Sequence, residues 1–192
     1  MRTFKALLFA GLLGTAALAQ AAPATYRLDP HHTMVLFSWG HFGFSHPTAE
    51  LGLGQGTLVF DPNHPEQASV EVTLPMAGLD THVPALDEHL AKPDFFDAAK
   101  YPLVTYKSTR VEVLGKDHFR ITGNLTVHGV TRPVVLEATL NRIGKHPMTG
   151  KPSIGFDASG TLKRSDFGVG AHAPSVSDEI SLHITTEGSV GG

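Results

Sequence analysis

The sequence predicts an all-β fold, and two patterns along the chain support this prediction. Apolar and polar residues alternate with a period of two in five segments: residues 69–75, 119–127, 134–140, 154–162 and 180–185. This alternation is typical of antiparallel strands that bury one face and expose the other. Strand-forming residues, bounded by Gly, Pro and Asn turns, dominate three more segments: residues 33–41, 56–61 and 103–113. Together these segments predict about eight antiparallel strands.

The number of strands favours an eight-stranded antiparallel barrel, because closure leaves no exposed edge strand and leaves room inside for side chains or one small ligand. A two-sheet sandwich shows the same alternation, so the pattern alone leaves both architectures open. The predicted inner face mixes large residues such as Phe60 and Phe156 with small ones such as Gly123 and Ala158. The small residues either leave volume for a ligand or receive neighbouring side chains.

One segment interrupts the alternation and predicts a short helical insert over about residues 84–99. Leu86 and Leu90 are four residues apart, which places them on one helix face, and Pro93 is predicted to start a second helical turn. We expect the apolar residues of the insert to cover the barrel or one of its mouths. Asp94 and Asp97 follow Pro93, where acidic residues stabilise the start of a helix, so a structural role is favoured over glycoside chemistry.

The first residues are predicted to form a cleaved export signal, residues 1–21. Arg2 and Lys5 precede an uncharged apolar run, and small residues with A-x-A spacing follow it. The run is shorter than the about 20 residues that a membrane span needs. We therefore expect residues 22–192 to form a single barrel domain, without a stable membrane span, in the periplasm or outside the cell.

The composition argues against several classes of function. The chain has no cysteine, which excludes disulfides, thiol catalysis and thiolate metal sites. A net charge of -3 provides no basic field for nucleic acid or for anionic lipid surfaces. Among 12 histidines, only His82 and His89, with Asp87 beside them, have a spacing that could share a helix face, and no His-Glu-x-x-His or G-x-S-x-G motif occurs. We expect no nucleic-acid partner, no metal and no required cofactor.

Several motifs resemble the YceI-like family of exported, lipocalin-like bacterial proteins that bind polyisoprenoid and related long-chain lipids. The motifs are "DPHHTMVLFSWGH", "LDTHVPALDEHLAKPDFFDAAKYPLVTYKST", "GNLTVHGVTRPVVLE", "KRSDFGVG" and "SDEISLHITTEGS". The matching positions are His32, Phe37, His41, Asp87, His89, Leu90, Phe95, Phe96, Pro102, His128, Gly129, Thr131 and Asp166. The resemblance implies an eight-stranded lipocalin-like barrel with a helix packed beside it and a ligand along an apolar tunnel. Leu86 stands where the family often has arginine, and "ELGLGQG" stands where a phenylalanine is expected.

The predicted ligand is an isoprenoid quinone, a polyprenyl lipid or a fatty-acid-like amphiphile, bound without catalytic residues. The apolar residues predicted to line its site are Val35, Phe37, Trp39, Leu58, Phe60, Val72, Leu86, Leu90, Phe95, Phe96, Tyr106, Phe119, Ile121, Leu136, Phe156 and Phe167. Polar contacts are expected from His32, His41 or His89, and a homodimer is compatible with a long barrel. Two alternatives stay open: an enzyme that uses His89 and Asp87 as an acid–base pair on a lipidic substrate, and a histidine-based metal or stress-response module.

Overall fold

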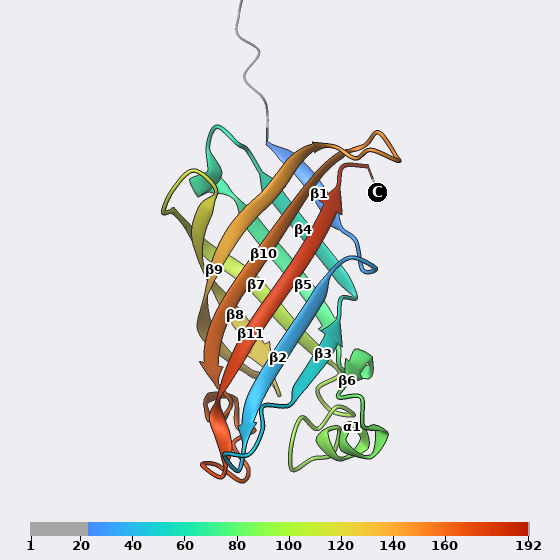
Figure 1. Cartoon of the computed structure of the whole chain (residues 1–192), viewed down its shortest axis with the longest axis vertical. Helices are drawn as coiled ribbons and strands as arrows, with labels where there is room; N and C mark the ends of the chain where they lie inside the picture. Colours follow the sequence, from blue (N-terminus) through green and yellow to red (C-terminus); the bar gives the residue numbers. More distant parts are fainter. Residues whose placement is uncertain (1–22, 192) are drawn as a thin grey trace, which may run out of the picture.

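The computed structural model describes residues 23–191, whose strands form a closed antiparallel barrel (Figure 1). The closed ring contains β1 (Ala24–Leu28), β4 (Gln55–Phe60), β5 (Ser69–Pro75), β7 (Leu103–Val113), β8 (His118–Val127), β9 (Val130–Lys145), β10 (Pro152–Lys163) and β11 (Val176–Ser189). Each strand pairs with the next in this order, and β1 also pairs with β11, which closes the ring. The predicted eight-stranded barrel is therefore confirmed over the sandwich.

Three further strands lengthen the wall toward the end of the barrel that carries the helix, called the lower end here (Figure 1). They are β2 (Met34–His41), β3 (Thr48–Gly52) and β6 (Leu79–Asp80). β2 pairs with β11, β3 pairs with β2, and β6 pairs with β3. Each continues a strand of the ring after a short interruption, as β1 does into β2, so one side of the barrel wall is built from broken strands.

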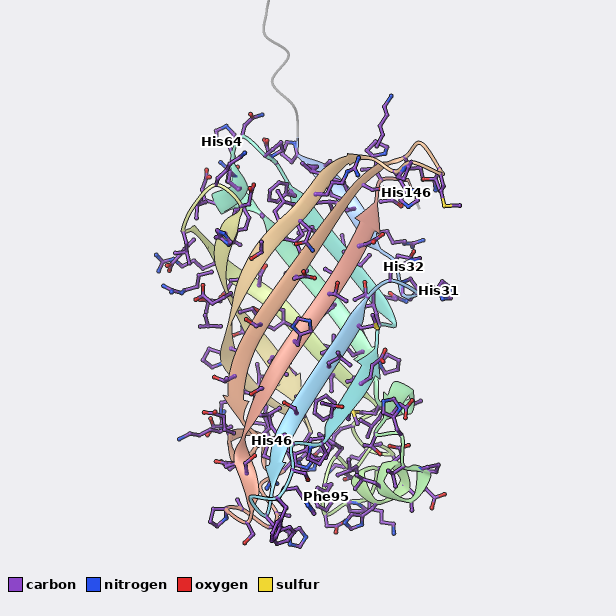
Figure 2. All side chains as sticks on the ribbon, in the orientation of Figure 1. His31, His32, His46, His64, Phe95 and His146 are labelled. Atoms are coloured by element: carbon purple, nitrogen blue, oxygen red, sulfur yellow. The ribbon has the colours of Figure 1, made fainter. Side chains whose placement is uncertain are left out.

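The turns at these interruptions contain two features of the sequence, the pair His31 and His32 and the glycine Gly54. His31 and His32 belong to the turn between β1 and β2, on the outside of the barrel, and not to a strand (Figure 2). Gly54 lies between β3 and β4, where its N–H donates to the carbonyl of Thr73 at 2.9 Å. A Cβ on Gly54 would lie 2.9 Å from the ring of Pro75, so this close approach of two strands requires glycine.

A segment called the insert, residues 81–102, connects β6 to β7. It begins with helix α1 (Pro84–Leu90), which starts at a proline that already has helical φ. Asp87 fixes this start, because its Oδ1 accepts hydrogen bonds from the Thr81 N–H at 2.8 Å and from the Thr81 hydroxyl at 2.6 Å. β6 ends its row of strands, so within residues 23–191 no strand pairing joins β6 to β7, and the insert occupies this part of the wall.

The second helix predicted after Pro93 is wrong. Residues 91–101 form turns, in which the Asp97 N–H returns to the carbonyl of Lys92 at 2.9 Å. Asp97 has a left-handed backbone conformation (φ 46°), which a right-handed helix cannot contain. These turns place Phe95 at the lower end of the barrel (Figure 2).

Short 3-10 turns complete the fold at Pro65–Gln67 (η1), Met76–Gly78 (η2) and Arg164–Phe167 (η3). The loop between β2 and β3, the insert and the segment after η3 gather at the lower end, whereas β1 starts and β11 ends at the upper end (Figure 1). No helix within residues 23–191 has the length and apolar character needed to cross a membrane. The predicted export signal lies outside the described residues.

Candidate ligand-binding cavity

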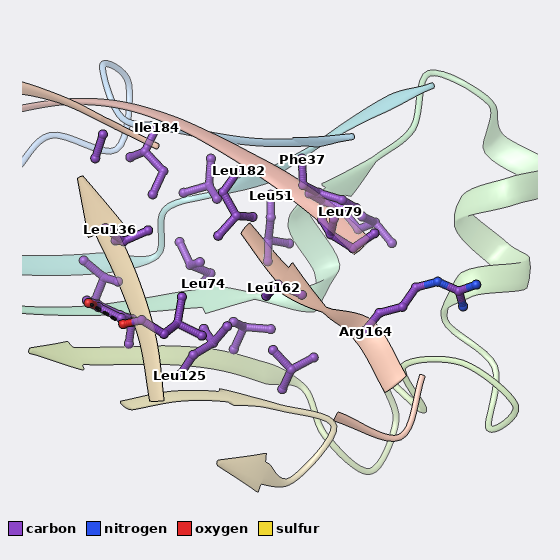
Figure 3. Close-up of a pocket in the computed structure, with 18 of the residues that line it drawn as sticks. Phe37, Leu51, Leu74, Leu79, Leu125, Leu136, Leu162, Arg164, Leu182 and Ile184 are labelled. Atoms are coloured by element: carbon purple, nitrogen blue, oxygen red, sulfur yellow. Dashed lines mark hydrogen bonds between the residues drawn. The ribbon is translucent and has the colours of Figure 1, made fainter. Parts of the chain in front are cut away.

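The barrel encloses a cavity of about 770 Å³. Every strand of the described chain contributes inward side chains to it, because alternate residues of a strand point to the same face. Figure 3 shows leucine side chains from different strands converging on this space; the labelled ones are Leu51, Leu74, Leu79, Leu125, Leu136, Leu162 and Leu182. The volume falls in the range of small-molecule sites, about 300–1,000 Å³. The lining is apolar along nearly its whole length.

Three aromatic rings pack across the cavity toward its upper end. Phe60, Phe119 and Phe156 contact one another with centroid distances of 5.8 to 6.2 Å in edge-on arrangements. Phe60 pairs with Ala24, the first residue of β1, which places the cluster near the upper end of the barrel. Edge-to-face packing of this kind is favourable for phenyl rings. The cluster therefore ends the cavity with an apolar surface.

The cavity opens at the lower end. Four of its lining residues are also exposed to solvent there, and together they define the mouth: His41, Phe42, Val83 and His172. The His89 ring lies edge-on to Phe95 with centroids 4.8 Å apart, and Phe95 lies 6.1 Å from the ring of His172. The insert and the segment after η3 thus meet through contacts between aromatic rings. The imidazole rings of His41, His89 and His172 line this end of the cavity, whereas phenyl rings cluster at the upper end.

Arg164 is a buried cation at the lower end of the cavity (Figure 3). Its guanidinium donates to four backbone carbonyls at 2.7 to 2.8 Å, namely those of Val169, Ala171, Val176 and Ser177. Burial lowers the pKa of Arg164 from its ordinary value. These bonds hold the segment from η3 to β11 against the barrel. Asp178 fixes the same segment, because its carboxylate accepts hydrogen bonds from the N–H and hydroxyl of Ser165 at 2.8 and 2.7 Å.

The small residues of the inner face have two different roles. A Cβ on Gly123 would lie 2.6 Å from the hydroxyl oxygen of Tyr106, so the Tyr106 ring occupies the space that this glycine leaves. The Tyr106 hydroxyl lies 3.2 Å from the carbonyl oxygen of Ile121, and burial raises the pKa of Tyr106 to about 12. Ala138 and Ala158, in contrast, line the cavity. Both explanations offered by the sequence therefore apply, at different positions.

The barrel is similar to those of a known protein family. The YceI-like domain family matches residues 26–188. The chain belongs to the YceI-like family. A relative in Pseudomonas syringae pv. tomato, named UPF0312 protein, is 39% identical over 92% of this chain and 93% of its own length.

Solved structures share the YceI-like fold. The crystal structure of Burkholderia cenocepacia BcnA matches with a TM-score of 0.75 at 24% identity, over 83% of this chain and 98% of that one. The structure of a polyisoprenoid binding domain from Saccharophagus degradans matches with a TM-score of 0.63 at 11% identity, over 88% of this chain and 99% of that one. These similarities concern the barrel architecture.

All the apolar residues that the sequence places in a ligand site lie in the wall of this YceI-like cavity. They include Leu86, Leu90, Phe95 and Phe96 of the insert, although the second helix is absent there. His41 and His89 also line the cavity. That these residues bind a ligand stays a prediction.

His32 lies outside the cavity, contrary to expectation. Its side chain is 63% exposed, and its Nδ1 lies 2.8 Å from Oδ2 of Asp29. This contact raises the pKa of His32 and lowers that of Asp29. The turn between β1 and β2 directs the residue away from the barrel interior. His172, Phe42 and Arg164 line the lower end of the cavity instead and were missed, since they lie in or beside loops where strand alternation gives no signal.

The acid–base pair needed for catalysis by this YceI-like protein does not form on α1. His89 and Asp87 are two residues apart, and such residues do not face each other on a helix. Asp87 directs Oδ1 at Thr81, whereas the His89 ring contacts Phe95. Within residues 23–191 no three His, Asp or Glu side chains gather as metal ligands, so His82 and His89 have no such site around them.

Proposed function

We propose that the protein binds a long-chain isoprenoid or fatty-acid-like amphiphile in the barrel and carries or sequesters it without catalysing a reaction. The observation that carries this proposal is the apolar cavity of about 770 Å³ that extends from the aromatic cluster to the mouth. The similarity in fold to a polyisoprenoid binding domain supports the same class of ligand. The His89 ring contacts Phe95 edge-on and Asp87 fixes the start of α1, which favours binding over catalysis by this pair.

The size of the cavity sets the length of the ligand. A water molecule has a share of about 30 Å³ in the liquid, and a methylene group is of similar size, so the cavity of about 770 Å³ holds about 25 such groups. Each buried methylene contributes about 0.8 kcal/mol, a gross gain of about 20 kcal/mol. Loss of translational, rotational and chain freedom offsets about 4–15 kcal/mol of it. Apolar burial alone therefore suffices for binding.

The two ends of the cavity orient the ligand. Three phenyl rings cluster at the upper end, whereas the mouth presents the imidazoles of His41, His89 and His172. An unpaired polar group is costly in an apolar space, so a polar head group is more stable at the mouth, beside hydrogen-bonding side chains and solvent. The proposed ligand thus lies with its tail toward Phe60 and its head toward the insert.

The proposed location is the periplasm or the outside of the cell. The export signal predicted in residues 1–21 supports it. A lipid that leaves a membrane in such a compartment must cross water, and an apolar barrel cavity shields its chain during that step.

Extraction of natively purified protein with organic solvent, followed by mass spectrometry, tests the proposal. We expect about one long-chain lipid per barrel, recovered chemically unchanged after incubation. The delipidated protein can then be titrated with farnesol, with fluorescence of Trp39 as the signal. Trp39 is the only tryptophan of the chain, and it lines the cavity 6.0 Å from Phe37. Absence of lipid in the extract together with absence of binding on titration would refute the proposal.

A further inference from the structure

We propose that the loop between β2 and β3, residues 42–47, docks the mouth of the barrel onto a phospholipid bilayer through Phe44. This inference goes beyond the binding of a ligand, because contact with a bilayer can be measured whether or not the cavity is filled. The bilayer is then the surface from which the barrel takes its ligand and to which the ligand is returned.

Phe44 is the most exposed large apolar side chain of the described residues, at 93%. A fully hydrated phenyl ring forgoes the stabilisation that burial would give it. Exposed apolar surface next to a binding cavity is typical of an interaction site. Phe44 does not line the cavity, so ligand packing does not explain it.

The loop presents Phe44 in a defined position. The His41 N–H donates to the carbonyl of Ser45 at 2.9 Å, and the Phe44 N–H donates to the carbonyl of His41 at 3.0 Å. The Phe42 N–H donates to the carbonyl of Ser175 at 2.8 Å, which ties the loop to the segment before β11. Phe42 and Gly43 both have left-handed backbones, with φ of 52° and 75°, and reverse the chain. Presentation by a pinned turn reduces the entropy lost on docking.

Apolar surface continues from the cavity to the tip of the loop. Phe42 belongs to the cavity wall and is also 55% exposed, and Phe44 lies two residues further along the loop. The loop lies at the lower end of the barrel, the end at which the cavity opens (Figure 1). A lipid chain that moves between a bilayer and the cavity would therefore pass along phenyl rings rather than through water. This continuity favours a lipid surface as the partner of Phe44.

The charge of the loop indicates which kind of bilayer it fits. Residues 41–48 contain no Asp, Glu, Lys or Arg, and the whole chain has a net charge of -3. Insertion of this tip desolvates no carboxylate, ammonium or guanidinium group, and no basic cluster attracts anionic head groups. We therefore expect docking to zwitterionic phospholipid, driven by apolar burial and insensitive to salt.

A matched control lies at the opposite end of the molecule. Met148 is 89% exposed in the loop between β9 and β10, at the upper end, away from the mouth. The full chain and the variants Phe44→Ser and Met148→Ser are each mixed with phosphatidylcholine vesicles and separated by flotation. We expect Phe44→Ser to lower the partition coefficient about tenfold and Met148→Ser to leave it unchanged. Addition of 0.5 M NaCl (about a 3–5 Å screening length) should not release the wild-type protein.

Three results would overturn the inference: wild-type protein that does not float, equal effects of the two substitutions, or release by salt. A Phe44-dependent dimer in sedimentation, without flotation, would assign the loop to self-association and overturn it as well. Titration of all three proteins with farnesol, followed through Trp39, is carried out in parallel. Absence of farnesol binding by the wild type, together with absence of lipid in the extract, would refute the proposed function alone, because flotation is scored separately.

Discussion

Ala158→Phe should shorten the ligand that the barrel accepts. Ala158 lines the cavity from β10, where it pairs with Ala138 on β9 and Ile184 on β11. It lies one inward step from Phe156, a member of the aromatic cluster at the upper end. A phenyl ring added here extends that cluster toward the mouth. The substitution therefore removes length from the apolar end of the cavity and leaves the mouth unchanged.

The structure sets the size of this effect. The added ring occupies the space of about six methylene-sized groups, about 180 Å³, which reduces the cavity from about 770 Å³ to roughly 590 Å³. Capacity falls from about 25 groups to about 19. A chain that fills the wild-type cavity loses up to about 5 kcal/mol of burial, more than a thousandfold in Kd, whereas a ten-carbon chain loses almost nothing.

Titration with alcohols of graded chain length measures this, with Trp39 fluorescence as the signal, since the substitution adds no tryptophan. Ser159→Phe is the control. Ser159 is exposed on the same strand, so this substitution adds the same ring outside the barrel. The expected result is a cut-off in chain length for Ala158→Phe alone. Equal weakening of short and long chains, or no weakening of either, would show that the ligand does not lie along the cavity as reasoned.

Packing and hydrogen bonding give three more expectations. Gly123→Ala should lower the free energy of unfolding in urea by about 1–3 kcal/mol, because the new Cβ overlaps the Tyr106 ring. Gly52→Ala is the control: a Cβ there meets nothing within 4 Å and should change the free energy of unfolding by less than about 0.5 kcal/mol. Similar values for the two substitutions would refute this. Arg164→Met leaves four carbonyls, of which that of Val169 is buried, without their donor. We therefore expect a loss of about 3 kcal/mol and a Tm about 6–12 °C lower in calorimetry, and an unchanged Tm contradicts this. Hydrogen bonds hold the pKa of Asp178 below its ordinary value, so its carboxylate stabilises the fold above about pH 4, and this contribution is lost as the pH falls through the lowered pKa. Asp178→Asn should therefore flatten the acid limb of the urea midpoint between pH 7 and pH 3, and an identical limb would disprove the linkage.

Long strands made the barrel predictable from sequence. Runs such as β8 and β10 alternate over 10 and 12 residues, which fixes both the strand and its inward face. β1 and β3 have five residues each and β6 has two, too few for a periodic signal to stand out. These three short strands were therefore not predicted, whereas β2, β4 and β5 on the same side of the wall were.

The alternation of apolar and polar residues does not predict the role of a residue that lies in a turn or binds the backbone of a loop. Arg164 follows the inward face of β10, where a cation has no place by alternation, and its partners are carbonyls of a loop that forms only in the folded chain. Pro93 signals a helix start, yet Asp97 turns the chain back toward β7. His32 shares a motif with cavity residues, but a turn rotates it outward. The turns at His32 and Asp97 are closed by bonds to Asp29 and Lys92, a few residues back, whereas the carbonyls that bind Arg164 lie up to 13 residues away.

Because β6 and β7 do not pair, the part of the barrel wall between them resists bending less than the rest. Around the ring, adjacent strands are joined by ladders whose hydrogen bonds must break together, so they resist bending. The insert fills the remaining gap by side-chain packing, in which Phe96 and Ala98 contact the core, whereas the bonds of Asp87 to Thr81 are internal to the insert. The insert therefore deforms more easily than the paired strands of the ring. A branched isoprenoid and a thinner straight chain would differ in how far they displace residues 81–102, while the diameter of the ring stays constant.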